Sequence, residues 1–101
     1  MNLTNEEIRI KVHEALGWTK RMQGPTHYAW SRGDYWHYLH EVPNYTESLD
    51  AIVPVIRALP TTEQWAIFET LLEVVPAEYP AACATAKEWC LAYLKTKGII
   101  P

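Results

Sequence analysis

Aromatic residues gather in one short stretch of this chain, and that stretch limits which folds are possible. Seven of the twelve aromatic side chains in the 101-residue sequence fall within residues 18–45. Inside it, two runs of strand-forming residues flank Ser31-Arg32-Gly33-Asp34, a cluster typical of a tight turn. We therefore predict one antiparallel β-hairpin near residues 26–40. The seven aromatic residues are Trp18, Tyr28, Trp30, Tyr35, Trp36, Tyr38 and Tyr45.

The second run of this hairpin divides its side chains between two faces, because successive side chains of a strand point in opposite directions. One face is expected to carry Tyr35, His37 and Leu39. The other is expected to carry Trp36, Tyr38 and His40. Both faces contain amphipathic aromatic side chains, so the pattern does not decide which of them packs against the rest of the protein.

The segment before the hairpin has the pattern of a helix followed by a loop. A first helix over about residues 5–16 is indicated by the capping-box spacing of Thr4 and Glu7 and by Gly17, which can end it. Residues 19–25 contain a Gly-Pro pair and are expected to form a loop.

After the hairpin, the apolar spacing predicts a second helix that ends near Leu59 and is capped by Thr46 or Ser48. Pro54 should kink this helix or shift its start, since proline lacks the N–H that an interior position requires. The apolar residues expected to face inward are Leu49, Ile52, Val53 and Ile56.

Two further helices complete the expected architecture. A second capping box, Thr61 to Gln64, starts a helix to about residue 75, and the last helix covers about residues 81–97 and ends at Gly98. The buried stripe of the third helix is expected to contain Trp65, Phe68, Leu72 and Val75. That of the last helix is expected to contain Ala82, Cys83, Ala86, Trp89, Cys90, Tyr93 and Leu94. The predicted fold class is a single α+β domain over residues 1–101, mainly helical with about four helices.

Charge is unevenly distributed along the chain. The net charge of -3 argues against binding of duplex DNA, which relies on basic side chains at the phosphates. By segment, however, residues 18–40 sum to +2 and residues 41–78 to -6. A compact phosphate-bearing ligand is therefore compatible with the hairpin region, and the acidic segment could face a basic protein.

Several functional classes receive no support from the sequence. The polar, acidic start lacks the pattern of a signal peptide, and no apolar run is long enough to span a bilayer, so we expect a cytoplasmic protein without membrane contact. Cys83 and Cys90 are seven residues apart in a predicted helix, too far for a disulfide, and are expected to be buried reduced thiols.

Metal binding and catalysis are not indicated either. His37 and His40 would point to opposite faces of a strand, so they are not expected to share a metal ion. The hairpin histidines and nearby carboxylates have no recognised catalytic spacing, and we expect neither a catalytic residue nor a cofactor. Arg32-Gly33-Asp34 is interpreted as a turn.

Two runs of the sequence, residues 30–38 (WSRGDYWHY) and 41–51 (EVPNYTESLDA), resemble a group of small phage and prophage proteins described as the phage ABA-sandwich domain. The Gly17-Trp18 pair and the alanine-rich segment 81–98 are similar to its helix ends. The sequence departs from the group because it lacks clear strands between the second and last helices, which favours helices flanking a small hairpin. The resemblance implies a phage origin and supplies no catalytic mechanism.

The expected function is non-catalytic binding of a nucleotide-derived immune signal, as in phage proteins that counter host defence. Rings beside cations can hold a base and its phosphates. The candidate ligand-binding residues are Lys20, Arg21, His27, Tyr28, Trp30, Arg32, Trp36, His37, Tyr38, His40 and Tyr45. Two alternatives remain open, a protein inhibitor that uses the acidic 41–78 segment and a signal-degrading hydrolase. A homo-oligomer is expected, because a chain of this size has few deep clefts.

Overall fold

The order of elements is one helix, a small sheet and then three more helices. The computed structural model describes residues 3–22, 28–75 and 84–101. Its elements are α1 (Asn5–Ala15), β1 (Thr19–Met22), β2 (Tyr28–Arg32), β3 (Tyr35–Tyr38), the short 3-10 helix η1 (Leu39–Glu41), α2 (Leu49–Arg57), α3 (Thr61–Val74) and α4 (Ala86–Thr96). The predicted α+β class, mainly helical with an antiparallel hairpin, is confirmed.

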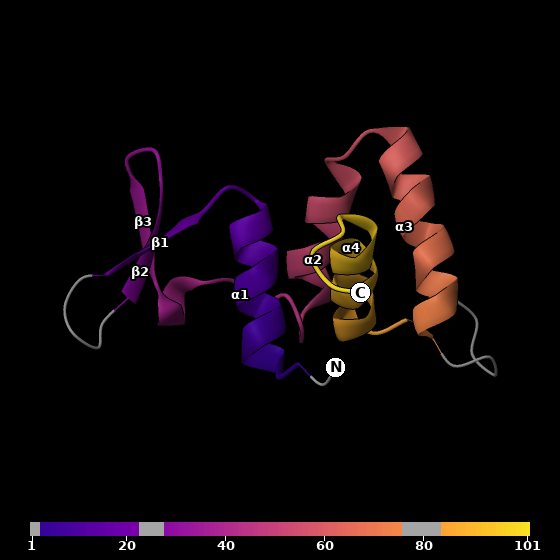
Figure 1. The fold of residues 1–101 in the computed structure, drawn as a ribbon, viewed down its shortest axis with the longest axis horizontal. Coiled ribbons are helices and arrows are strands. Elements are labelled where there is room, and N and C mark those ends of the chain that lie inside the picture. Colours follow the sequence, from indigo (N-terminus) through magenta and orange to yellow (C-terminus); the bar gives the residue numbers. More distant parts are fainter. Residues whose placement is uncertain (1–2, 23–27, 76–83) are drawn as a thin grey trace.

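The elements form an elongated body of about 46 × 28 × 24 Å. The sheet lies at one end, α1 lies next to it, and the other three helices form the opposite end (Figure 1). Helix α4 packs against α1, α2 and α3, so the last helix of the chain is the centre of the helical part. The strand order in the sheet is β1-β2-β3, and both neighbouring pairs are antiparallel.

The ends of α1 and α4 follow from local sequence signals. Thr4 Oγ1 accepts the Glu7 N–H at 3.1 Å, and the Glu7 carboxylate accepts the Thr4 N–H at 3.2 Å, which confirms the predicted capping box. Helix α4 begins with an equivalent box at Thr85. It ends at Thr96, and Gly98, which follows the C-cap residue Lys97, has a φ of +74° that favours glycine; the Ile99 N–H donates to the Leu94 carbonyl at 3.0 Å.

The second predicted capping box, Thr61 to Gln64, does not form. The N-cap of α3 is Pro60, without a side-chain hydrogen bond. Gln64 instead donates its amide to the carbonyls of Arg57 at 3.2 Å and Leu59 at 2.7 Å, because these carbonyls at the end of α2 need donors. A short α2–α3 connection places them within reach of the Gln64 side chain.

Thr4→Ala and Thr61→Ala should therefore differ in stability. Thr4→Ala removes a side-chain cap and should lower the free energy of unfolding by about 1 kcal/mol. Thr61→Ala removes no side-chain cap at the start of α3 and should change it by less than about 0.5 kcal/mol. Urea denaturation of both variants measures the difference, and equal losses would contradict the assigned caps.

The sheet contains one strand more than predicted. Residues 19–22, expected within a loop, form the edge strand β1, which pairs with β2 in the register Lys20 to Trp30. Its four side chains are all exposed, so it carries no alternation of apolar and polar residues. It pairs because β2 has a free edge beside it. The other half of the predicted loop lies outside the described residues.

The hairpin itself is confirmed, with a shorter second strand. Arg32 pairs with Tyr35 across a two-residue loop in which Gly33 has a φ of +61°, the conformation that favours glycine at this position. Strand β3 ends at Tyr38, and the 3-10 helix η1 begins at Leu39. The predicted strand positions Leu39 and His40 therefore belong to a helical turn.

Helix α2 continues through Pro54 and is preceded by Ser48, which makes no side-chain capping bond. Ile52 and Ile56 are buried as predicted, and Val53 is half-buried. Leu49, expected to face inward, is 46 % exposed. The prediction that Leu49, in the first turn of the helix, faces the core is therefore wrong.

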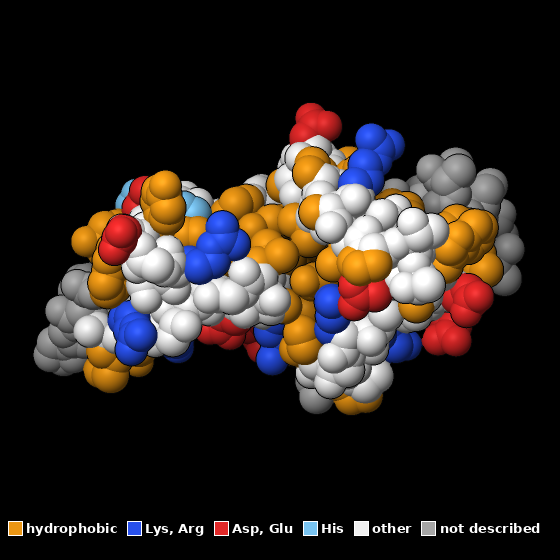
Figure 2. Space-filling model, turned by 90° about the horizontal axis from the view of Figure 1, so that it is seen from above, with side chains coloured by type: hydrophobic (Ala, Val, Ile, Leu, Met, Phe, Trp, Pro, Cys, Tyr) orange, Lys and Arg blue, Asp and Glu red, His pale blue; other side chains and the backbone are white. Residues whose placement is uncertain are grey.

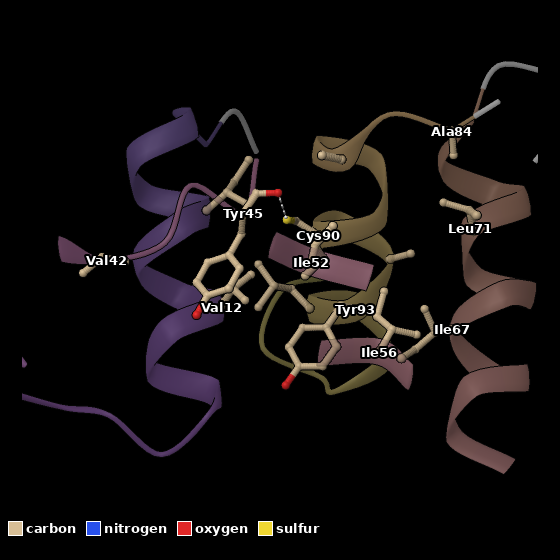
Figure 3. Packing of buried hydrophobic residues seen from close by; sticks show 14 of the residues in the cluster. Val12, Val42, Tyr45, Ile52, Ile56, Ile67, Leu71, Ala84, Cys90 and Tyr93 are labelled. Carbon is tan, nitrogen blue, oxygen red and sulfur yellow. Dashed lines mark hydrogen bonds between the residues drawn. The ribbon is translucent and has the colours of Figure 1, made fainter. Parts of the chain in front are cut away.

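Helix α3 turns a different face to the core than its sequence suggested. Ile67 and Leu71 are buried, whereas Trp65 is 63 % exposed and Leu72 is 56 % exposed. Of the predicted stripe, only Val75 is buried, and Phe68 is also exposed. The helix has two apolar stripes, and α4 covers the one that contains Ile67 and Leu71 (Figure 3).

The core joins all four helices (Figure 3) and extends to Trp30 on the inner side of the sheet. Tyr93, Leu94 and Cys90 of α4 are fully buried at its centre. The Cys90 thiol donates to the Tyr45 carbonyl at 3.2 Å, and burial raises its pKa to about 12, so it is a protonated free thiol. Cys83 and Ala82 lie outside the described residues.

Candidate functional site

The sheet has an inner face that packs on α1. Directly paired residues of antiparallel strands share a face, so Lys20, Trp30 and His37 lie on the same side. The buried Trp30 donates its indole N–H to the Glu14 carboxylate at 3.1 Å. Arg32 donates to the Leu16 carbonyl at 3.2 Å. These contacts fix the sheet to the helical part.

A histidine cluster, defined by His13, Trp18, His37 and Tyr45, forms the centre of this contact. Nδ1 of His13 lies 3.2 Å from the Tyr45 hydroxyl oxygen, and its Nε2 lies 3.2 Å from Nδ1 of His37. Trp18 stacks on both imidazoles, with ring centroids 4.6 Å from His13 and 4.1 Å from His37. In neutral His13 one ring nitrogen donates and the other accepts, which satisfies both neighbours.

Burial sets the protonation of this cluster. The pKa of His13 is lowered from 6.5 to about 4, mainly by burial, with smaller contributions in the same direction from the neighbouring His37, Arg32 and Arg9. Burial also raises the pKa of Tyr45 to about 12. At neutral pH His13 and Tyr45 are therefore uncharged and hydrogen-bonded to each other, and the cluster has the features of a structural contact between sheet and helices.

The outer face of the sheet carries exposed rings. Trp36 pairs with Ser31, and Tyr38 pairs with Ala29, so both rings lie on the face opposite Trp30 and His37. Trp36 is 48 % exposed and Tyr38 is 52 % exposed. His40 follows from η1 and lies parallel to Tyr38, with centroids 6.1 Å apart and an interplanar angle of 4°. Three flat rings thus lie on or beside this face.

Among the residues that the structure describes, the cation on the outer face is Arg21. Arg21 pairs with Ala29, which lies between it and Tyr38, and its Nε donates to Ser31 Oγ at 3.4 Å. The guanidinium is therefore held across small side chains, beside the two rings. We name the set of Arg21, Trp36, Tyr38 and His40 the outer platform. Surface apolar side chains at both ends of the molecule are visible in Figure 2.

The structure divides the predicted ligand-binding residues among three environments. The outer platform contains Arg21, Trp36, Tyr38 and His40. The inner face carries Lys20, Tyr28, Trp30, Arg32 and His37, with the Lys20 ammonium 4.0 Å from the Tyr28 ring centroid. Tyr45 is buried in the histidine cluster, and His27 lies outside the described residues. Because Trp30 and Tyr45 are buried, their rings present no surface for stacking.

Sequence reasoning missed His13 as the partner of His37. It occupies the inner side of α1, and its partners lie 24 and 32 residues away, so no local spacing links them. It also missed a hollow at the other end of the molecule, because Trp65 and Phe68 were assigned to the core. This hollow is lined by residues of α2, α3 and α4.

Residues 3–22, 28–75 and 84–101 contain no group of three or more His, Cys, Asp or Glu side chains that could hold a metal ion. No helix in this part of the chain has the length and apolarity required to cross a bilayer.

Comparison with protein-family models, with curated proteins and with solved structures finds no significant match to this chain.

Proposed function

We propose that this protein binds a nucleotide-type ligand on the outer platform and does not degrade it. The observation that carries the proposal is the pair of half-exposed rings, Trp36 and Tyr38, on one sheet face beside Arg21. Large exposed aromatic side chains are costly in water unless a partner covers them, and aromatic faces are surfaces on which bases stack.

The spacing of the rings favours a ligand with two bases. Residues two apart in a strand are separated by about 7 Å. This exceeds the separation of stacked bases, so each ring can receive one base of a splayed dinucleotide. His40 lies parallel to Tyr38 and extends the same surface. We therefore expect dinucleotides to bind more tightly than mononucleotides.

The charge around the platform suits a compact ligand. Arg21 is on the platform itself, whereas Lys20 and Arg32 lie on the opposite face. One guanidinium can pair with one phosphate in a bidentate contact. A long nucleic acid would need a continuous cationic track, which the outer platform does not provide.

The decisive experiment compares ring variants on the same strand. Trp36→Ala should weaken binding of a cyclic dinucleotide at least about fivefold, since stacking of one base contributes about 1–3 kcal/mol. Tyr35→Ala is the matched control, because Tyr35 is 73 % exposed on the same strand but on the other face. Isothermal titration would use a cyclic dinucleotide, a cyclic trinucleotide, a mononucleotide and ADP-ribose.

Two results would contradict the proposal. One is the absence of heat with all four ligands. The other is an equal loss of affinity in Trp36→Ala and Tyr35→Ala, which would move the site off the platform. Chromatography of the released ligand tests the non-catalytic part, since a binder returns it intact and a hydrolase does not.

The resemblance to small phage proteins suggests that the proposed role is sequestration of an immune signal in the host cytosol.

Association of two copies of the chain is the second expectation. A flat platform leaves one side of a base uncovered, and a second copy of the chain that closes over the ligand would cover it. Sedimentation velocity with and without the cyclic dinucleotide measures this association.

The acidic 41–78 segment offers less support for a protein inhibitor. Glu41 lies on η1 beside the sheet and accepts the Tyr38 backbone N–H, whereas Glu69 and Glu73 lie on α3 at the other end of the molecule (Figure 1). Glu63 pairs with Lys97 at 3.0 Å. These carboxylates therefore do not form one acidic surface.

A further inference from the structure

A hollow of about 600 Å³ lies among α2, α3 and α4, at the end of the molecule away from the sheet. Its lining is mostly apolar: Val53, Ile56, Arg57, Thr61, Gln64, Trp65, Phe68 and Trp89. The volume falls within the range of small-molecule sites, about 300–1,000 Å³. Trp65 and Phe68 are exposed, so the hollow is open to solvent on one side.

The hollow is a consequence of how the helices pack. Helices α2 and α3 each pack on α4 but make little contact with each other. The end of α2 and the start of α3 are held together by Gln64, which donates to the Arg57 and Leu59 carbonyls. The half-buried Trp89 of α4 lines the space between the two helices. The pocket is therefore preformed and does not require a rearrangement to accept a ligand.

The pocket has one charge. Arg57 is the only charged residue in the described lining, and the carboxylate nearest in sequence on α3, Glu63, is paired with Lys97 instead. An apolar hollow with a cationic rim complements a molecule with an apolar body and a single anionic group.

We propose that this pocket binds a small amphipathic carboxylate, with its apolar body against Trp65, Phe68 and Trp89 and its carboxylate on Arg57. Flat aromatic walls favour an aromatic body, because offset stacking adds to the burial of apolar area. A guanidinium can bind a carboxylate with two parallel hydrogen bonds. This site is separate from the outer platform and does not depend on it.

The experiment uses 2-naphthoate as the probe and 2-naphthalenemethanol as its uncharged counterpart. Binding to the whole protein is measured by isothermal titration and by the NMR shifts of the indole N–H groups. Naphthoate should bind at least tenfold more tightly than the alcohol and should shift the Trp65 and Trp89 signals. Arg57→Gln should abolish the difference between the two probes, and Phe68→Ala should weaken both at least fivefold.

Leu72→Ala is the matched control, because Leu72 is exposed on the same helix but does not line the pocket. It should bind naphthoate like the unchanged protein. The proposal is overturned if naphthoate fails to bind at millimolar concentration, or if the alcohol binds equally well. It is also overturned if the free protein self-associates in sedimentation and Phe68→Ala makes it monomeric, since a second copy would then occupy the pocket.

Discussion

Leu71→Ala should lower the free energy of unfolding by about 2–5 kcal/mol, the usual cost of emptying a buried leucine site. Leu71 is fully buried on the face of α3 that packs against α4. The loss combines the transfer free energy of the removed methyl groups with the cavity they leave. Because a domain of this size has a total stability of about 5–15 kcal/mol, this single change removes a large fraction of it.

The neighbouring residue supplies the control. Leu72 is 56 % exposed, and Leu72→Ala should change the free energy of unfolding by less than about 0.5 kcal/mol. Urea denaturation followed by far-UV circular dichroism measures both variants under the same conditions. A larger loss in Leu72→Ala than in Leu71→Ala would show that α3 buries the stripe of Trp65, Phe68 and Leu72 after all.

Acidification from pH 7 to pH 4 should destabilise the protein by up to about 3 kcal/mol through His13 alone, since one pKa unit corresponds to about 1.4 kcal/mol. Burial holds the pKa of His13 at about 4 in the folded protein, against 6.5 in the unfolded chain. Between these values the unfolded chain binds the extra proton. The stabilisation is therefore complete above pH 6.5 and is lost as the pH falls towards 4.

The surroundings of His13 explain why the folded protein resists protonation. His37 of β3 lies beside it, and Arg32 of β2 and Arg9 of α1 are the cations that act on it, while Tyr45 is its hydrogen-bond partner. Glu14 is engaged by the Trp30 indole N–H. A proton on His13 would therefore add positive charge at the contact between sheet and helices.

The measurement is the slope of unfolding free energy against pH from 6.5 to 4. His13→Phe keeps a flat ring in the stack but cannot titrate, so its slope should be flatter than that of the unchanged protein. Leu72→Ala changes an exposed side chain that does not titrate and is the control, whose slope should match that of the unchanged protein. Parallel slopes for the unchanged protein and His13→Phe would be incompatible with the assigned role.

Predictions from the sequence succeeded at several positions where the signal and its effect lie within one turn of chain, although the Thr61–Gln64 capping box failed because Gln64 bonds to the carbonyls at the end of α2. The Thr4 capping box, the stop at Gly98 and the turn at Gly33 were all predicted and are all present. Each depends on a side chain or a backbone angle that acts on residues at most a few positions away. The hairpin and the α+β class followed from these local signals.

Predictions failed where a distant element made the choice. Strand β1 has only exposed side chains, so nothing in Thr19–Met22 marks it as a strand until β2 offers its edge. The platform was predicted in part, because alternation placed Trp36 and Tyr38 together, but the pattern could not say that their face is the outer one. That choice depends on Trp30 and His37, which contact α1.

The sequence by itself determined the start of α1, the end of α4, the turn of the hairpin and which side chains of one strand share a face, because these properties depend on local backbone geometry. Only the tertiary structure decided which face is buried. Helix α3 carries two apolar stripes with equal helical spacing, and the position of α4 selected the one with Ile67 and Leu71. Whether a side chain is buried depends on the element that packs over it as well as on the side chain itself. For α3 that element is α4, which lies many residues away in the chain.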